Sequence, residues 1–223
     1  MTGVYGLAEG RASAHLEQVV PLPRFAKLPE DRRRSILEAA RTEFAAEGFA
    51  DASYNRIIAA TGISKGAMYY YFADKADLYT AVLEDALDAI EAVALKAGPL
   101  PTTSPDDFWT ALRGRALELA MAVEADKDLA AIGHRLYSSG VGVQHITARV
   151  SRWIGTLLAV GRECDAVRVD MSMEILAHAT TGLMMGLDRY MASNMATLSD
   201  AEKLAASTDA MQLCEDLLRV PSS

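Results

Sequence analysis

The sequence predicts an all-α fold, and three observations support this. Helix-favouring residues such as Ala, Leu, Glu, Arg and Met are abundant among the 223 residues, whereas runs rich in Val, Ile and Thr are scarce. Apolar residues recur at helical spacing in successive segments, and no segment alternates apolar and polar residues as a half-buried strand does. The pattern divides the chain into an N-terminal arm over 1–28, a small helical head over 29–75 and a larger helical body over 76–223.

The arm has no sustained periodicity. Its glycines and prolines predict a flexible segment; they are Gly3, Gly6, Gly10, Pro21 and Pro23. The start of the chain lacks the charged segment and long apolar run of a signal peptide. No apolar stretch approaches the roughly 20 residues needed to cross a bilayer. We therefore expect a cytoplasmic protein.

Cysteine and histidine are too sparse to indicate a metal site. Cys164 and Cys214 lie far apart in segments predicted as helical, where we expect buried, reduced thiols. The four histidines are scattered along the chain. We expect neither a metal nor another cofactor.

The head begins with a helix predicted over 29–47, which Gly48 ends. Its apolar residues form one stripe: Ile36, Leu37, Ala40 and Phe44. Two short helices are predicted over 54–61 and 65–72, and Gly62 between them permits the positive φ that a sharp turn needs. Their expected N-caps are Ser53 and Ser64.

The body follows from a long helix predicted over 74–96, which Asp74 caps and which Gly98 and Pro99 interrupt. Further helices are predicted over 105–125, 126–137, 141–163, 170–193 and 200–220.

Charge is distributed unevenly between head and body. The chain has a net charge of −8, which by itself argues against a DNA-binding protein. Residues 24–75, however, contain nine Lys and Arg against seven Asp and Glu, a balance of +2 that leaves −10 for the rest. A mildly basic head on an acidic body is compatible with DNA binding, because only the contacting face needs positive potential.

The segment over 58–78 (IAATGISKGAMYYYFADKADL) closely resembles the signature of the tetracycline-repressor (TetR) family. The preceding segment over 36–49 (ILEAARTEFAAEGF) is similar to the first helix of that family, and the resemblance extends over about residues 30–85. It implies an N-terminal helix-turn-helix that binds operator DNA. It also implies a helical C-terminal domain that dimerises and often holds a small-molecule inducer.

The same resemblance assigns the candidate DNA contacts. Lys65, Gly66 and Ala67 match positions that reach base edges, and a lysine that donates to guanine is worth roughly 1–3 kcal/mol of discrimination. Ser64 caps a helix whose free N–H groups can approach phosphate. The positions that match backbone or flanking contacts are Ser53, Asn55, Tyr69, Tyr71 and Lys75.

Met68 and Phe72 are expected to pack inward. Three consecutive tyrosines cannot all point inward on a helix, and we assign Tyr70 to the interior of the head or its edge. The other interpretation of residues 69–72 is an aromatic core cluster.

A run of basic residues lies before and at the start of the first helix. Arg32, Arg33 and Arg34, with Arg24 and Lys27 before them, could follow phosphates or enter a minor groove. The alternative is an ordinary solvated helix start.

The last two predicted helices are candidates for a homodimer interface built as a four-helix bundle. Their small and large apolar residues are Ile175, Ala179, Gly182, Leu183, Gly186 and Tyr190 in the first, and Leu204, Met211, Leu213, Leu217 and Leu218 in the second. The alternative for each of them is ordinary core packing within the chain.

Aromatic, histidine and methionine side chains in the body are candidates for an inducer site. They are Trp109, His134, Tyr137, Trp153, His178 and Met184, and they suggest a small apolar or aromatic effector. The alternative for each is a satisfied core residue. Because the helix over 74–96 joins head to body, its tilt would set the separation of two recognition helices, which must be about 34–36 Å to enter successive major grooves.

An enzyme and a helical interaction module are the two alternative classes of function. An enzyme would need a catalytic constellation, and the four histidines lack one. A helical interaction module with a head that no longer binds DNA remains an alternative, as does activation instead of repression.

Overall fold

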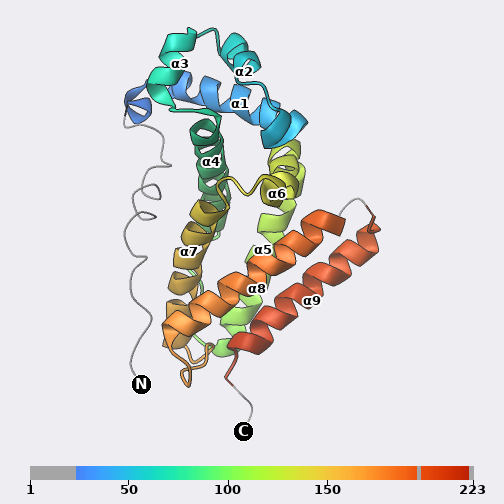
Figure 1. Ribbon diagram of the computed structural model, residues 1–223. Helices are drawn as coiled ribbons and strands as arrows, with labels where there is room; N and C mark the ends of the chain where they lie inside the picture. Colours follow the sequence, from blue (N-terminus) through green and yellow to red (C-terminus); the bar gives the residue numbers. More distant parts are fainter. Residues whose placement is uncertain (1–23, 195–196, 221–223) are drawn as a thin grey trace, which may run out of the picture.

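The computed structural model describes residues 24–194 and 197–220, and every regular element in this part is helical. Figure 1 shows a head at one end, from which α4 runs down into a body of packed helices. The elements of the head are η1 (Phe25–Lys27), α1 (Glu30–Asp51), α2 (Tyr54–Thr61) and α3 (Lys65–Tyr71). Those of the body are α4 (Lys75–Lys96), α5 (Pro105–Ala125), α6 (Lys127–Ser139), α7 (Val143–Glu163), α8 (Met173–Asn194) and α9 (Asp200–Leu218).

The predicted all-α fold is confirmed, and each predicted helix is present with ends that differ by at most four residues. The largest difference is in α1, which continues to Asp51 although Gly48 departs from helical geometry at φ 75° and ψ 173°. The expected apolar stripe of α1 is buried. Gly48 therefore interrupts the helix where the sequence predicts its end, and a short further turn follows up to Asp51.

Residues 1–23, most of the arm, lie outside the described residues. Residues 24–28, which the sequence analysis assigned to the same arm, pack on the head. Phe25 is only 4% exposed, and its ring centroid lies 4.7 Å from that of Phe72. The head thus begins before the first long helix.

Helix α4 carries the core of the head into the body. Leu78, Tyr79 and Val82 are buried with the residues of α1 and α3, while Leu87 further along packs against the same cluster. A helix of 22 residues is about 33 Å long. Its first turns therefore belong to the head and its last turns to the body.

Polar contacts supplement the packing between head and body. Arg135 of α6 donates to the carbonyl oxygens of Ala45 and Ala46 at the end of α1, at 2.8 and 2.7 Å. Arg41 of α1 forms an ion pair with Asp126 at the start of α6. Helix α6 therefore holds α1 through both apolar and polar contacts.

Helix α7 is tied to α4 by an ion cluster. Arg149 donates to the carboxylates of Glu84, Asp88 and Glu91, each at 2.6 Å, and His145 pairs with Glu84. These acidic residues project from successive turns of α4, so one arginine neutralises much of that face.

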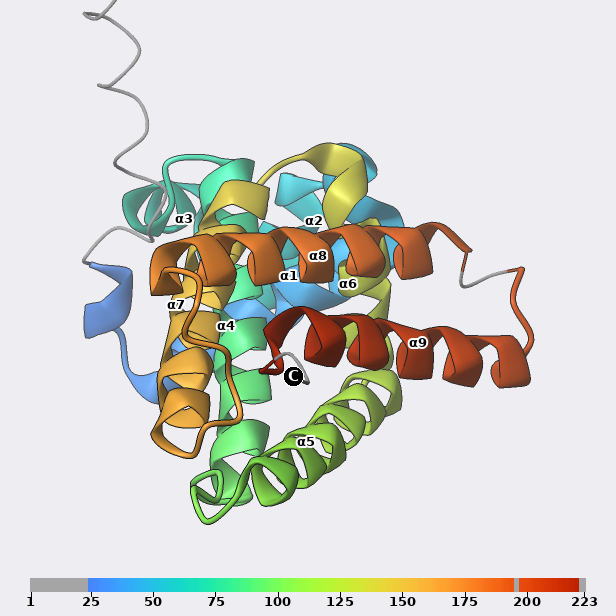
Figure 2. The same ribbon diagram turned by 90° about the horizontal axis from the view of Figure 1, so that it is seen from below.

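A second core fills the lower body around Phe108, Trp109, Leu158 and Leu176. Figure 2 shows α8 and α9 side by side as a hairpin across the body. Leu218, predicted for the dimer face, is 5% exposed and Leu217 packs against the second core, so this prediction is wrong for Leu218 and the chain itself covers both.

No described helix is both long and apolar enough to cross a membrane. Residues 24–194 and 197–220 contain no group of three or more His, Cys, Asp or Glu side chains arranged to hold a metal ion. Cys164 and Cys214 are free thiols, buried and half-buried respectively.

Candidate nucleic-acid interface

Helices α2 and α3 form a helix-turn-helix whose ends are set by local hydrogen bonds. The Ser53 hydroxyl accepts from the backbone N–H of Arg56 at 3.3 Å, and the Ser64 hydroxyl accepts from that of Ala67 at 3.1 Å. Gly62 ends α2 at φ 66°, in the left-handed region that favours glycine. Both predicted caps and the predicted turn are confirmed.

Helix α3 is anchored by apolar side chains on its inner side. Met68 and Phe72 have 0% exposure, as expected, and pack with Ile57 of α2 in the core of the head. The ring of Tyr69 lies 5.3 Å from that of Tyr54, which links the outer sides of α2 and α3. This anchoring fixes the outer face of α3 relative to the head.

The start of α2 is fixed to α1 through Glu43. Its carboxylate accepts from the backbone N–H of Ser53 at 2.6 Å and from the Arg56 Nε at 2.9 Å. The bond from Arg56 holds the pKa of Glu43 below its usual value. Asn55, two residues after Ser53, is exposed. Ser53 therefore has both its N–H and its hydroxyl engaged, whereas Asn55 is accessible to a ligand.

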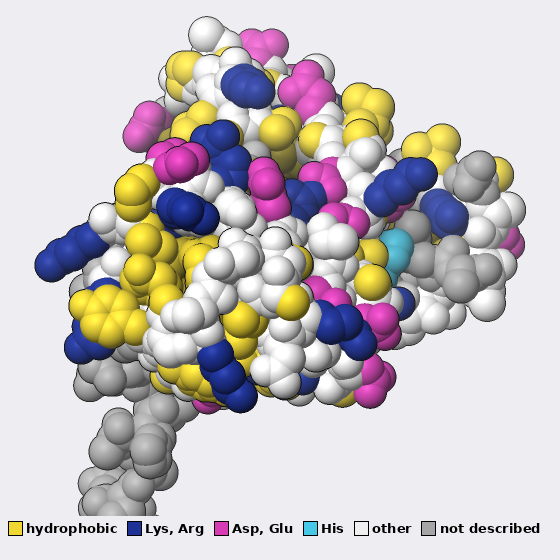
Figure 3. All heavy atoms as spheres, turned by 90° about the horizontal axis from the view of Figure 1, so that it is seen from above, with side chains coloured by type: hydrophobic (Ala, Val, Ile, Leu, Met, Phe, Trp, Pro, Cys, Tyr) yellow, Lys and Arg dark blue, Asp and Glu magenta, His cyan; other side chains and the backbone are white. Residues whose placement is uncertain are grey.

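The outer face of α3 brings several of the candidate DNA contacts together. Lys65, Gly66 and Tyr69 are exposed and Ala67 is half-buried. A Cβ added at Gly66 would meet nothing within 4 Å. Figure 3, which looks down on the head, shows Lys and Arg side chains around a group of hydrophobic ones at the lower left of the view.

Tyr70 was assigned to the interior of the head or its edge, and this prediction is wrong. Its side chain is 52% exposed, and it follows Gly66 by four residues, so both lie on the outer face of α3. Tyr71 is the tyrosine that packs inward, because the ring of Phe25 lies 6.5 Å from it and helps to cover it. The periodicity of α3 alone did not reveal Phe25 as its neighbour.

Lys75 has a structural role in addition to its candidate role. Its Nζ donates to the carbonyl oxygens of Ala50 and Ala52, both at 3.0 Å, and lies 4.9 Å from the centroid of the Phe49 ring. The ammonium group therefore satisfies carbonyls at the end of α1. Whether it also binds phosphate remains a prediction.

The basic run at the start of α1 is partly neutralised. Arg33 and Arg34 both pair with Glu30, and Arg32 is exposed. Ion pairs of this kind, three or four residues apart, are typical of a solvated helix face. The structure thus favours the ordinary interpretation for Arg33 and Arg34.

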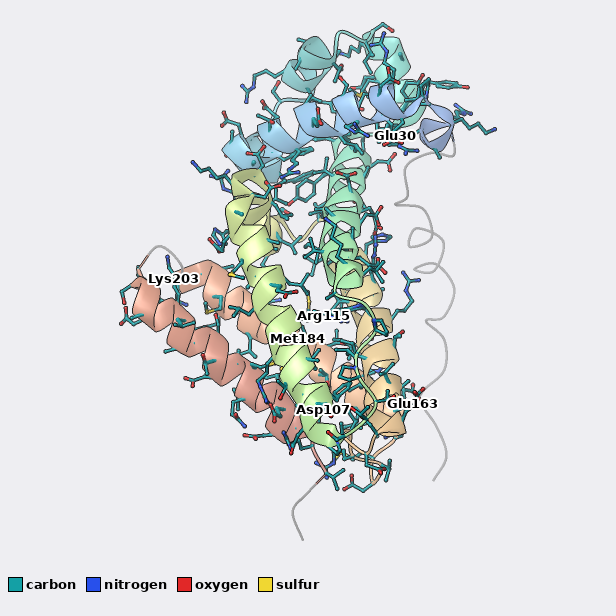
Figure 4. The ribbon with its side chains drawn as sticks, turned by 180° about the vertical axis from the view of Figure 1, so that it is seen from behind. Glu30, Asp107, Arg115, Glu163, Met184 and Lys203 are labelled. Atoms are coloured by element: carbon teal, nitrogen blue, oxygen red, sulfur yellow. The ribbon has the colours of Figure 1, made fainter. Side chains whose placement is uncertain are left out.

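The six candidate inducer residues do not surround one cavity. Trp109 is 1% exposed and its Nε1 donates to the carbonyl oxygen of Ala166 at 3.2 Å. Trp153 and Met184 pack against the second core, and Figure 4 places Met184 in the middle of the body. His134 is exposed. These four therefore serve as core or surface residues.

A groove of about 470 Å³ lies between α7 and α8. His178 is the one candidate on its wall; the lining residues are Val143, Gln144, Thr147, Ala148, Ser151, His178, Thr181, Gly182, Met185 and Arg189. Tyr137 lies beside it: its hydroxyl contacts the Met185 sulfur at 3.7 Å and the Arg189 guanidinium lies 5.2 Å from its ring centroid. Burial raises the pKa of Tyr137 to about 12.

A model of the family described as "Bacterial regulatory proteins, tetR family" matches residues 36–82. The match begins within α1, spans α2 and α3, and ends in the first turns of α4. It therefore falls on the candidate interface.

Curated relatives extend the similarity along the chain. The HTH-type transcriptional repressor Rv1474c of Mycobacterium tuberculosis is 29% identical over 196 residues, which cover 83% of this chain and 96% of that protein. The HTH-type transcriptional repressor AcnR of Corynebacterium glutamicum is 42% identical over 67 residues, or 30% of this chain and 36% of that protein.

Solved structures share the fold. A TetR-family transcriptional regulator from Rhodococcus sp. aligns with a TM-score of 0.63 over 85% of this chain and 100% of that chain, at 19% identity. At this identity the likeness concerns the arrangement of the helices.

Proposed function

We propose that this chain, whose residues 36–82 match the tetR family model and which is 29% identical to a curated transcriptional repressor over 96% of that protein, is a DNA-binding repressor of the TetR family. It binds a palindromic operator as a homodimer and is released by a small-molecule inducer. Its relatives are named transcriptional repressors, which are not enzymes. The observation that carries the proposal is the exposed outer face of α3, fixed by a buried inner face.

For the DNA contact, we assign base readout to Lys65, with Gly66 and Ala67 allowing close approach to the groove. Tyr69 contacts the phosphate backbone from the same helix, and Asn55 contacts it from α2. Ser53, Ser64, Tyr71 and Lys75 act mainly by holding the helices in place, because their polar groups or rings already have partners within the head.

For the dimer, we assign the outer faces of α8 and α9. Ile175 and Tyr190 are 62% and 54% exposed, and Leu204 and Leu213 are 63% and 51% exposed. Small residues lie between the large ones on α8: Ala179, Gly182 and Gly186. An exposed apolar stripe of this kind is typical of an interface, and the small residues allow two helices to approach closely. Four such helices across a two-fold axis form a bundle.

For induction, we assign the groove between α7 and α8, which an apolar or aromatic effector suits. One side of α7 lines the groove, through Thr147 and Ser151, and another side holds α4 through Arg149. An effector that shifts α7 would therefore change the tilt of α4 and the separation of the two heads. The effector releases DNA only if it binds more tightly to the state in which the separation of the two heads does not fit successive major grooves.

We place the DNA-binding domain at 29–75, with the ligand-binding and dimerisation domain at 76–223. We also place the protein in the cytoplasm, where bacterial operator DNA lies.

The test is selection from a randomised duplex-DNA pool by the full chain. The variant is Lys65→Ala/Tyr69→Ala, since both side chains are exposed, whereas substitution of Tyr71 or Lys75 would also disturb packing. Lys96→Ala, at the far end of α4, is the control. We expect the wild type and the control to enrich one palindrome and the double variant to lose most binding. A wild type that enriches no sequence at low salt would contradict the proposal, and the body would then be tested for a protein partner.

A further inference from the structure

The short segment before α1 is pinned to the end of the recognition helix. Phe25 is 4% exposed, and its ring centroid lies 4.7 Å from that of Phe72 and 6.5 Å from that of Tyr71. The backbone N–H of Leu28 donates to the Phe25 carbonyl at 3.0 Å and closes one turn of 3-10 helix. The position of Arg24 is therefore set by a buried neighbour.

Arg24 lies over the exposed ring of Tyr70. The guanidinium carbon is 4.5 Å from the ring centroid, within the range of a cation–π contact. Tyr70 is 52% exposed on the same face of α3 as Gly66. Within residues 24–194 and 197–220, no ion pair joins Arg24 to an acidic side chain. A guanidinium that is stacked and not paired keeps its N–H edges available to an anion.

We propose that Arg24 and Tyr70 form a phosphate-binding pair that grips the DNA backbone at the rim of the major groove. The inference rests on the proposed DNA-binding function and adds Arg24, which lies outside the helix-turn-helix, to the contacts made by α3. The first residues of a recognition helix contact base edges. Tyr70 is in the last turn of α3, so it lies toward the wall of the groove, where the phosphates are. Both groups can donate there: Arg24 through two parallel N–H groups and Tyr70 through its hydroxyl.

Residues 1–23, which precede Arg24, add no net positive charge from Lys, Arg, Asp and Glu side chains. Residues 1–23 contain Arg11 as their one basic Lys or Arg residue, against Glu9 and Glu17. Among the described residues before α1, the positive charge comes from Arg24 and Lys27. A phosphate contact carries no sequence information, so the pair adds affinity without changing the operator that is read.

The test measures binding of the full chain to the duplex that the wild type selects, across a range of salt concentrations. We expect Arg24→Ala to bind about threefold to tenfold more weakly at 0.15 M salt, with the slope of log K against log salt reduced by about 1.8, because the homodimer loses one phosphate contact in each protomer. The selected sequence stays the same. Tyr70→Ala weakens binding as well, and the two changes together cost less than their sum because they remove one unit.

Two further variants make the outcome decisive. Lys27→Ala removes one positive charge from the same segment without touching the stacked pair, and Arg24→Lys keeps the charge but loses the planar fork. We expect Lys27→Ala to bind more tightly than Arg24→Ala, and Arg24→Lys to fall between wild type and Arg24→Ala. Equal losses in Lys27→Ala and Arg24→Ala, or an unchanged affinity and slope in Arg24→Ala, overturn the inference while the proposed function stands. A wild type that selects no duplex overturns both.

Discussion

The Nζ of Lys75 donates a hydrogen bond to the carbonyl oxygen of Ala52 at 3.0 Å, so the first residue of α4 is tied to the C-cap of α1. A second bond, to the Ala50 carbonyl, has the same length. The lysine that the family resemblance assigns to phosphate thus also holds α1 and α4 together.

Lys75→Met is therefore expected to lower the free energy of unfolding by about 1.5–3 kcal/mol, the range for a hydrogen bond to a charged group. The aliphatic stem is kept, so the loss comes from the two carbonyls left without a donor. Urea denaturation measures the change. Lys65→Met, on an exposed lysine, is the control and should be within about 0.5 kcal/mol of wild type. Equal stability of the two variants would contradict this structural role of Lys75.

Asp77 gives a prediction about pH. It is 6% exposed; its Oδ2 accepts from the Ala73 N–H at 2.9 Å, whereas its Oδ1 is buried with no hydrogen-bond partner. Burial raises its pKa. Because the folded pKa lies above the unfolded one, stabilisation by the bound proton is complete below the unfolded value of about 3.9 and is lost as pH rises through the folded value. The charged form thus costs stability at neutral pH.

Asp77→Asn is expected to stabilise the protein by roughly 1 kcal/mol at pH 7, because the amide keeps the bond from Ala73 and removes the buried charge. The advantage should shrink as pH falls toward 4. Denaturation at a series of pH values checks this. Asp74→Asn replaces one good N-cap by another and should change little. An advantage of the Asp77 variant that is the same at every pH would mean that charge is not its cause.

Much of the head could be predicted because its signals are local. The caps Ser53 and Ser64 accept from N–H groups three residues away, and Gly62 ends α2 through its own positive φ angle. Tyr70 was misplaced because the residue that decides which tyrosine packs inward is Phe25, about 45 residues earlier and outside any periodic segment. Long-range packing of this kind leaves no period in the sequence.

The inducer site was the least predictable part for the same reason. Residue type singled out Trp109 and Trp153, but large aromatic side chains serve a core as well as a pocket. The wall of the groove includes small and polar side chains such as Ala148 and Ser151, which no motif marks. Only the packing of α7 against α8 makes them part of a groove.

The ion cluster between α4 and α7 predicts a salt-dependent stability. Arg149→Ala leaves the carboxylates of Glu84, Asp88 and Glu91 facing one another without a cation. We expect a loss of about 1–2 kcal/mol at low salt that narrows at 1 M salt, because the added ions screen the repulsion. Arg152→Ala, an exposed arginine on the same helix, is the matched control for denaturation at both salt concentrations. If Arg149→Ala loses the same free energy of unfolding at both salt concentrations, repulsion among the carboxylates is not the cause.

Two glycines of α7 predict opposite effects of the same substitution. A Cβ at Gly161 would lie 2.5 Å from Val167 and 2.9 Å from Phe108, whereas one at Gly155 would meet nothing within 4 Å. Gly161→Ala is expected to cost about 1–3 kcal/mol through overpacking of the second core. Gly155→Ala should stabilise the helix by about 0.5–1 kcal/mol. Thermal unfolding at one protein concentration compares them, and changes of the same sign would contradict this description of the core.

The outer face of α8 gives the prediction that bears most directly on assembly. Ile175 is 62% exposed, so Ile175→Asp should leave the fold of the single chain nearly unchanged. In a four-helix bundle across a two-fold axis, the same carboxylate would be buried twice against apolar side chains, at a cost of several kcal/mol. We expect analytical ultracentrifugation to show a dimer for wild type and a monomer for Ile175→Asp. Leu95→Asp changes a leucine that is 72% exposed near the end of α4, and this control variant should stay dimeric.

Operator binding should fall together with the dimer, because one head reaches only half of a palindrome. A dimeric Ile175→Asp protein would move the interface to another face, and a monomeric one that still binds the full operator tightly would separate DNA binding from assembly.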